Sequence, residues 1–161
     1  MTSGITEKPH GVLLITPWLN IFPTKLYRSQ HAPPRDILDD PVGIYWASCF
    51  ADHASLSDKA KMTHLRPLEC SLPWKDILPS KCVITTGTDD LLRAGCLELR
   101  DQAKQNGLDI EVEIEENQIH DWQWGEVTND IFYLSTSRTQ KKEFDFKGAK
   151  QLARIITDMA G

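Results

Sequence analysis

The sequence lacks any hydrophobic run of membrane length and any excess of positive charge. None of its apolar stretches approaches the roughly 20 residues that a transmembrane helix needs. Met1 leads into polar residues, which predicts no signal peptide. The 18 basic residues are scattered among 23 acidic ones, and the formal net charge is −5. These features favour neither a membrane nor a nucleic acid as a partner.

Cysteine is also scarce. The four cysteines are widely spaced, at Cys49, Cys70, Cys82 and Cys96. This spacing favours reduced thiols in a cytoplasmic protein over a disulfide framework. The histidines share no metal-ligand spacing with one another or with a cysteine pair, so we expect neither a metal nor a cofactor.

The composition that remains is that of a globular protein, with 40% hydrophobic and 25% charged residues in a chain of 161. We find no internal repeat and predict one domain over residues 1–161. Many of the nine prolines fall within residues 18–80. This segment is interpreted as a long insertion that forms a lid or pocket wall, or else a surface excursion packed on the sheet. Helices are expected within it over residues 42–52 and 57–64.

The middle of the chain has the clearest secondary-structure pattern. Residues 82–86 form a short β-branched apolar run, which is typical of a buried strand. From Leu91 the apolar residues recur at helical spacing, and Gly107 favours the end of that helix. Residues 109–115 alternate between aliphatic residues and glutamates, which predicts a strand with a solvated glutamate face. The three segments together predict a βαβ unit.

Acidic residues follow the first of these strands, and a histidine follows the second. The acids are Asp89 and Asp90, and the histidine is His120. Because the strands of a βαβ unit run parallel, we expect both loops at the same carboxyl edge of the sheet, where ligands bind. A carboxylate beside a histidine is the orienting half of a hydrolytic triad. The alternative is that His120 is an ordinary loop histidine and that the aspartates cap the helix.

Two further elements flank this unit. Gly11–Thr16 is a continuous apolar run closed by Pro17, which predicts a parallel strand covered on both faces. The last helix is predicted to begin at Phe146, with Asp145 as its N-cap. Its expected buried stripe consists of Phe146, Ala149, Leu152, Ala153 and Ile156.

Four segments, taken in order, resemble the C-terminal half of an α/β-hydrolase of the hormone-sensitive-lipase-like esterase group. Gly11–Asn20 resembles the family strand that ends Ser-Pro-Trp-Leu-Asp, and Pro67–Pro79 resembles the lead-in to the acid strand. Gly87–Arg93 resembles the acid turn, and Ile119–Trp122 resembles the histidine loop. The resemblance covers nearly the whole chain. It implies an α/β class chain with an incomplete α/β-hydrolase fold, made of C-terminal parallel strands, crossover helices and a lid-like insertion.

The resemblance also implies roles for individual residues. His120 matches the catalytic base of the family. Asp90 matches the triad acid, since the stretch from Asp90 to Arg93 reproduces the family's Asp-Pro-Leu-Arg spacing. Counting two residues forward from Gly87 leaves Asp89 as the alternative acid. The aspartate that is not the acid then forms the turn or caps the helix.

The chain departs from the family in one important respect. It contains neither the Gly-x-Ser-x-Gly nucleophile elbow nor the His-Gly-Gly-Gly oxyanion motif. Because triad members act as a unit, we expect an esterase fragment that is inactive alone and acts on a small-molecule ester only when completed by an N-terminal half. The strand Gly11–Thr16 would then pair with a second copy or a partner chain. The alternative hypothesis is a non-catalytic interaction protein that pairs through this sheet edge.

Overall fold

The computed structural model describes residues 8–20, 36, 45–47, 49, 67–69, 72–126 and 146–161. The chain separates into two compact units, residues 1–120 and 121–161. Of the helix expected over residues 42–52, residues 45–47 and 49 are described and are helical. The expected helix over 57–64 and much of the 18–80 insertion lie outside the described residues.

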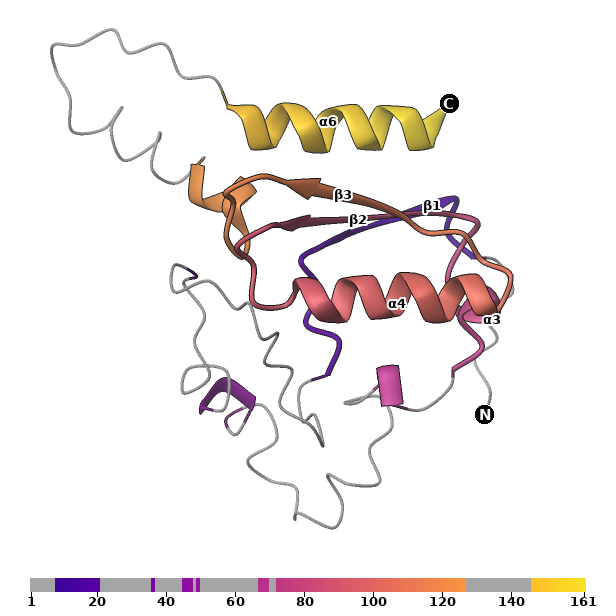
Figure 1. Ribbon diagram of the computed structural model, residues 1–161. Coiled ribbons are helices and arrows are strands. Elements are labelled where there is room, and N and C mark those ends of the chain that lie inside the picture. Colours follow the sequence, from indigo (N-terminus) through magenta and orange to yellow (C-terminus); the bar gives the residue numbers. More distant parts are fainter. Residues whose placement is uncertain are drawn as a thin grey trace, which may run out of the picture. The chain divides into compact units, whose positions relative to one another are not determined.

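In the described part of the first unit, a parallel sheet has three strands in the order β1-β2-β3 (Figure 1). The strands are β1 (Gly11–Ile15), β2 (Lys81–Gly87) and β3 (Glu111–Glu115). Each expected strand is present, with one or both ends shifted by one or two residues. β1 and β3 both pair with β2, and Gly87 lies opposite Glu115 in the register of the second pair. The loops that follow β2 and β3 therefore leave the sheet at one edge.

One helix connects β2 to β3 and packs on a face of the sheet, as Figure 1 shows. This helix is α4 (Arg93–Gln105), and its buried residues, Cys96, Leu99 and Ala103, are among the apolar residues that recur at helical spacing from Leu91. Two shorter elements, η2 (Pro67–Glu69) and α3 (Trp74–Ile77), also contact α4. The core between the helix and the sheet consists of Leu68, Trp74, Cys82, Ile84, Cys96, Leu99, Ala103, Leu108 and Ile110.

The start of α4 differs from the prediction. The helix begins at Arg93 rather than Leu91. The two preceding N–H groups, of Leu91 and Leu92, donate to the carboxylates of Asp36 and Asp90. Because these side chains take the N–H groups that lead into the first turn, the chain keeps a turn conformation there before the helix begins.

The outer strands are less covered than their sequence patterns indicated. All five residues of β1 are partly exposed, and within the described part of the chain β1 pairs with β2 alone. The predicted alternation does not continue through β3, since Ile110, just before the strand, is buried whereas Ile114 is 44% exposed. Glu113 and Glu115 are partly buried, so the glutamate face is not simply solvated. The α4 core covers the beginning of β3 and leaves its carboxyl end open.

The second unit contains a short helical turn over residues 122–126 and α6 (Lys147–Ala160). A Cβ atom at Gly148 would lie 2.7 Å from the Cα of Gln123, so the helix packs closely on that turn. The amide of Gln123 donates to Gln151 at 3.2 Å, and the N–H of Gly148 donates to Glu126 at 2.9 Å. These contacts determine which side of α6 faces inward.

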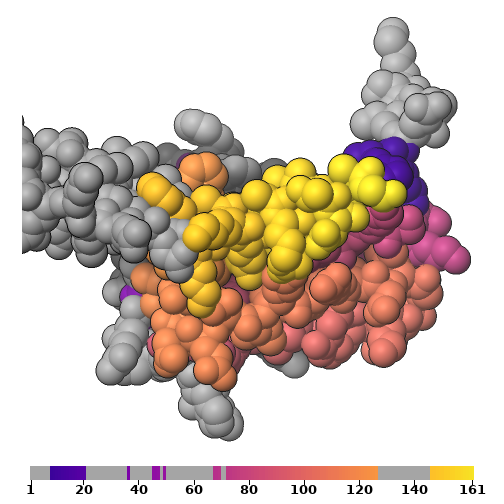
Figure 2. Space-filling view, turned by 90° about the horizontal axis from the view of Figure 1, so that it is seen from above, coloured from indigo at the N-terminus to yellow at the C-terminus, as the bar shows by residue number. Residues whose placement is uncertain are grey.

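The buried stripe predicted for this helix was wrong. Gly148 and Ile155 are buried, whereas Ile156 is 55% exposed. Figure 2 shows an exposed face of α6, in yellow. The close approach of Gly148 to Gln123 sets this rotation. The helix also begins one residue later than expected, because Phe146 has a left-handed φ of 46°. The expected cap, Asp145, lies outside the described residues.

Candidate active site

The loops that follow β2 and β3 are joined to each other by backbone hydrogen bonds. The N–H of Thr88 donates to the carbonyl of Glu115, and the N–H of Asp89 donates to that of Gln118, both at 2.9 Å. The hydroxyl of Thr88 in turn accepts the N–H of Asn117 at 2.8 Å. These bonds continue the pairing of the strands beyond their ends. The acid turn and the histidine loop are thus held as one structure.

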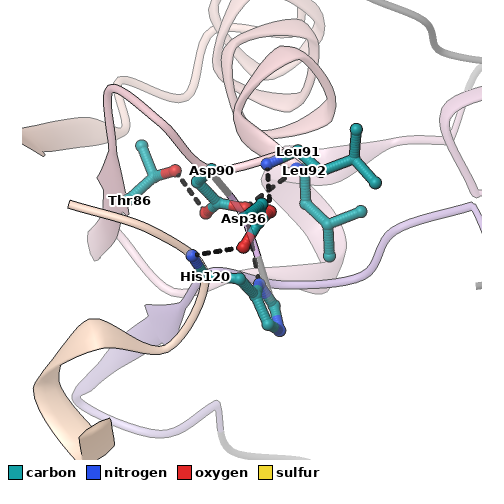
Figure 3. Close-up of polar contacts among 6 residues, drawn as sticks. All are labelled: Asp36, Thr86, Asp90, Leu91, Leu92 and His120. Atoms are coloured by element: carbon teal, nitrogen blue, oxygen red, sulfur yellow. Dashed lines mark hydrogen bonds and ion pairs between the residues drawn. The ribbon is translucent and has the colours of Figure 1, made fainter. Parts of the chain in front are cut away.

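Asp90 lies in the turn that follows β2, and its side chain has no solvent exposure. One carboxylate oxygen accepts the hydroxyl of Thr86 at 2.7 Å, and the other accepts the N–H of Leu92 at 2.8 Å (Figure 3). Thr86 belongs to β2 and is itself buried. One donor is a side chain of β2 and the other is a backbone N–H at the entry to α4, and together they fix the orientation of the carboxylate.

His120 faces that carboxylate. Its Nδ1 lies 3.4 Å from Oδ1 of Asp90, and the imidazole is 13% exposed (Figure 3). The separation is slightly longer than an ordinary hydrogen bond, as is common for such pairs before substrate binds. A carboxylate opposite Nδ1 favours the tautomer that carries its proton there. Nε2 is then the nitrogen that can accept a proton.

The contact with His120 comes from Asp90 rather than from Asp89. The Asp89 carboxylate instead accepts the hydroxyl of Thr88 at 3.3 Å, within the turn. Of the two roles expected for the other aspartate, the turn-forming one fits Asp89, because the N–H of Leu92 is bound by Asp90. The acid beside the histidine therefore also holds the entry to α4.

A third carboxylate, which the sequence analysis did not identify, bridges the two loops. Oδ2 of Asp36 accepts the N–H of Leu91 at 2.6 Å, and Oδ1 accepts the N–H of His120 at 3.0 Å (Figure 3). Asp36 lies in the proline-rich segment, where no periodicity or motif distinguishes it from its neighbours. No sequence signal would have found it, because its partners are 55 and 84 residues away.

The buried thiol nearest to this carboxylate cluster is not an activated nucleophile. Burial raises the pKa of Cys96 to about 12, and the negative charge of Asp90 acts in the same direction. Near neutral pH the thiol is therefore protonated and poorly reactive. Among the described residues, no group of three histidine, cysteine or acidic side chains lies close enough to hold a metal ion. No helix in the same part of the chain is long and apolar enough to span a membrane.

Several solved structures share this fold. A hormone-sensitive lipase from a metagenome library aligns with 95% of the chain at a TM-score of 0.65 and 16% identity. The protein EstE5 aligns with 94% of the chain at a TM-score of 0.61 and 22% identity. An esterase of the bacterial hormone-sensitive lipase family aligns with 94% of the chain at a TM-score of 0.60 and 16% identity. The chain has the fold of the carboxyl-terminal half of an α/β-hydrolase.

This α/β-hydrolase fold confirms, at the level of structure, the resemblance inferred from the four ordered motifs. The chain spans 43% of the length of EstE5 and 45% of the length of the metagenome lipase. No protein-family model matches the sequence, and none of the curated proteins matches it. At these identities the likeness establishes the architecture, and the chemistry has to be argued from the residues at the sheet edge.

Proposed function

We propose that this chain supplies the acid–base part of a carboxylic-ester hydrolase active site. His120 is the general base, and Asp90 orients it. The observation that carries the proposal is the 3.4 Å contact between Nδ1 of His120 and the fully buried carboxylate of Asp90. It lies where β2 and β3 end, the edge at which open α/β sheets bind ligands. Similarity to the fold of esterases supports the same assignment.

In the proposed reaction, a serine hydroxyl attacks the carbonyl carbon of a small-molecule ester. Nε2 of His120 accepts the hydroxyl proton, and the Asp90 carboxylate stabilises the imidazolium that forms. His120 then returns the proton to the departing alcohol, which leaves an acyl-serine. Water, deprotonated by the same nitrogen, then attacks the acyl carbon. His120 returns that proton to the serine oxygen as its bond to the acyl carbon breaks, which releases the carboxylic acid and restores the serine hydroxyl. The hydrogen bonds from Thr86 and Leu92 keep the carboxylate aimed at Nδ1 throughout.

The serine itself is proposed to come from residues outside these 161. The sequence contains no Gly-x-Ser-x-Gly and no His-Gly-Gly-Gly. In the α/β-hydrolase pattern the nucleophile precedes the acid and the histidine along the chain. We therefore propose that the 161 residues alone do not turn over esters, because an acid–histidine pair without a nucleophile and oxyanion donors lacks the groups that react.

The test compares the 161-residue chain with the polypeptide obtained when any in-frame coding sequence upstream of Met1 is included. The chain alone is expected to hydrolyse p-nitrophenyl butyrate no faster than its His120→Ala variant. The longer polypeptide is expected to contain Gly-x-Ser-x-Gly and to lose activity by about 10³-fold or more on the same substitution. A His120-dependent rate of ester hydrolysis by the 161 residues alone would overturn the proposal. The proposal would also be wrong if the longer polypeptide hydrolysed esters at the same rate with and without His120.

A second candidate function rests on the exposed strand β1. Within the described residues β1 pairs on one side only, and each of its residues is partly exposed. Such an edge accepts a further strand through main-chain hydrogen bonds.

Under this hypothesis the chain is a non-catalytic interaction protein, and the purified chain forms oligomers through β1. Leu13→Pro, which removes an N–H from the strand, would then disperse the oligomers. A purified chain that is monomeric by light scattering argues against this function.

A further inference from the structure

Asp36 uses both oxygens of one carboxylate to hold two separate loops. It accepts the N–H of Leu91, the residue after the proposed acid, and the N–H of His120, the proposed base. We propose that Asp36 is a positioning residue that sets the separation between Asp90 and His120. This inference rests on the proposed function of that pair and extends it to a residue from the proline-rich segment.

The geometry supports a role in spacing. Hydrogen bonds from N–H groups to a carboxylate are stronger than those between neutral groups, and these two measure 2.6 and 3.0 Å. The two oxygens of a carboxylate have a fixed separation, so the two N–H groups are held at a fixed distance from each other. One of these groups belongs to His120 itself, and the other is adjacent to Asp90 (Figure 3).

The other bonds between the loops act further from the reacting groups. Thr88 and Asp89 bond to Glu115 and Gln118, near the ends of β2 and β3. These bonds hold the loops together without touching the backbone of His120. The Asp36 carboxylate adds a tie at the histidine, and it does so from a segment remote in sequence. Residues 18–80 therefore contribute a residue to the site in addition to any covering role.

Substitutions at position 36 can show whether the Asp36 carboxylate positions His120 through its hydrogen bonds or only fills space. Asparagine has nearly the same shape but only one acceptor oxygen, so its amide NH₂ would face one of the two N–H donors. Glutamate keeps both oxygens on a side chain one methylene longer. Asp36→Asn should therefore break one tie, and Asp36→Glu should restore part of it. Asp89→Asn is the matched control, because it removes the same charge from the adjacent turn and leaves the ties to Leu91 and His120 in place.

The experiment uses the 161-residue chain and needs no ester hydrolysis. Hydrogen exchange measured by mass spectrometry follows the amides of Leu91 and His120, and nitrogen-15 spectra of labelled histidine follow the tautomer of His120. In Asp36→Asn we expect exchange to accelerate about tenfold or more at whichever of these two amides loses its acceptor. We also expect His120 to lose its single Nδ1–H tautomer, and Asp36→Glu to recover part of it. Asp89→Asn should leave both readouts unchanged, and circular dichroism verifies that each variant folds.

The outcomes distinguish this inference from the proposed function. If the Nδ1–H tautomer depends on Asp90 but is the same in Asp36→Asn, the positioning role is wrong and the acid–base pair stands. If the tautomer of the unaltered chain is not sensitive to Asp90→Asn, the pair itself is wrong. If Asp36→Asn accelerates amide exchange but leaves the tautomer of His120 unchanged, Asp36 only holds the loops together, and the inference is wrong.

Discussion

Gly87 lies so close to Gln118 that a Cβ atom at position 87 would stand 1.9 Å from the Gln118 carbonyl oxygen. The atom it would meet belongs to backbone, which cannot rotate away as the end of a side chain can. Gly87 ends β2, and Gln118 lies two residues before His120. Because Gly87 has no side chain, the loop that carries His120 can approach the turn that carries Asp90.

Gly87→Ala should displace the histidine loop and destabilise the protein. Overpacking against fixed backbone costs about 1–3 kcal/mol, which urea denaturation measures. Gly95→Ala is the matched control, because its Cβ would meet only Leu68 at an ordinary 3.7 Å. Gly95 lies within α4, where alanine is favoured over glycine by about 0.5–1 kcal/mol. Opposite signs for the two variants are expected, and equal destabilisation would contradict the close approach at Gly87.

Substitution of the two adjacent aspartates should have very different effects. Asp90→Asn places an amide among donors that now bind a buried carboxylate, so we expect a loss of about 1–3 kcal/mol of unfolding free energy. Asp89 bonds only weakly within its turn, and Asp89→Asn should change stability by less than about 0.5 kcal/mol. Urea denaturation of both variants measures the difference. A larger loss for Asp89→Asn would mean that the acid has been assigned to the wrong residue.

Removal of the Thr86 hydroxyl tests how much its hydrogen bond to the Asp90 carboxylate stabilises the protein. Thr86→Val keeps the shape and strand propensity of the residue but removes the 2.7 Å hydrogen bond to the buried Asp90 carboxylate. We expect the free energy of unfolding to fall by about 1–3 kcal/mol, because a buried acceptor then lacks a donor. Thr86→Ser keeps the hydroxyl and should lose only the contribution of one methyl group, about 1 kcal/mol. If both variants lose the same amount, the hydrogen bond is not what stabilises this site.

The buried thiols should make the fold weaken in alkaline solution. Burial raises the pKa of Cys82 to about 11 and that of Cys96 to about 12, from an ordinary value of 9.0. As pH rises above 9, the unfolded chain loses these protons before the folded chain does, so unfolding becomes more favourable. The stabilisation is complete below pH 9 and is lost progressively towards pH 11 and 12. Replacing both cysteines with alanine should flatten the unfolding free energy between pH 9 and 11, and an unchanged slope would contradict this account.

The sequence contained enough local information to predict the sheet and its central crossover. Alternation and β-branched runs located the described strands, and helical spacing from Leu91 predicted the helix whose buried residues are Cys96, Leu99 and Ala103. The right-handed βαβ rule then brought Asp90 and His120 to one edge. Each of these inferences depends on contacts between neighbouring layers, and periodicity in the sequence reports such contacts directly.

Periodicity failed where burial depends on a single close approach or on the end of a strand. The stripe expected on α6 was rotated away from the observed one, because Gly148 packs on Gln123. Ile114 was expected to be buried with Ile110, but the α4 core does not extend to the end of β3. In both places the spacing of the apolar residues identified the element correctly. It did not identify which of those residues are buried, because that depends on the segment that packs against the element.

By itself the sequence determined the parallel strands, the crossover helix and the edge that carries the acid and the histidine. Tertiary structure alone decided which aspartate meets His120 and that Asp36 joins the two loops across 84 residues. The physical reason is the range of the interactions. Patterns of hydrophobic residues record burial within one element, whereas a hydrogen bond between distant segments leaves no periodic trace in either.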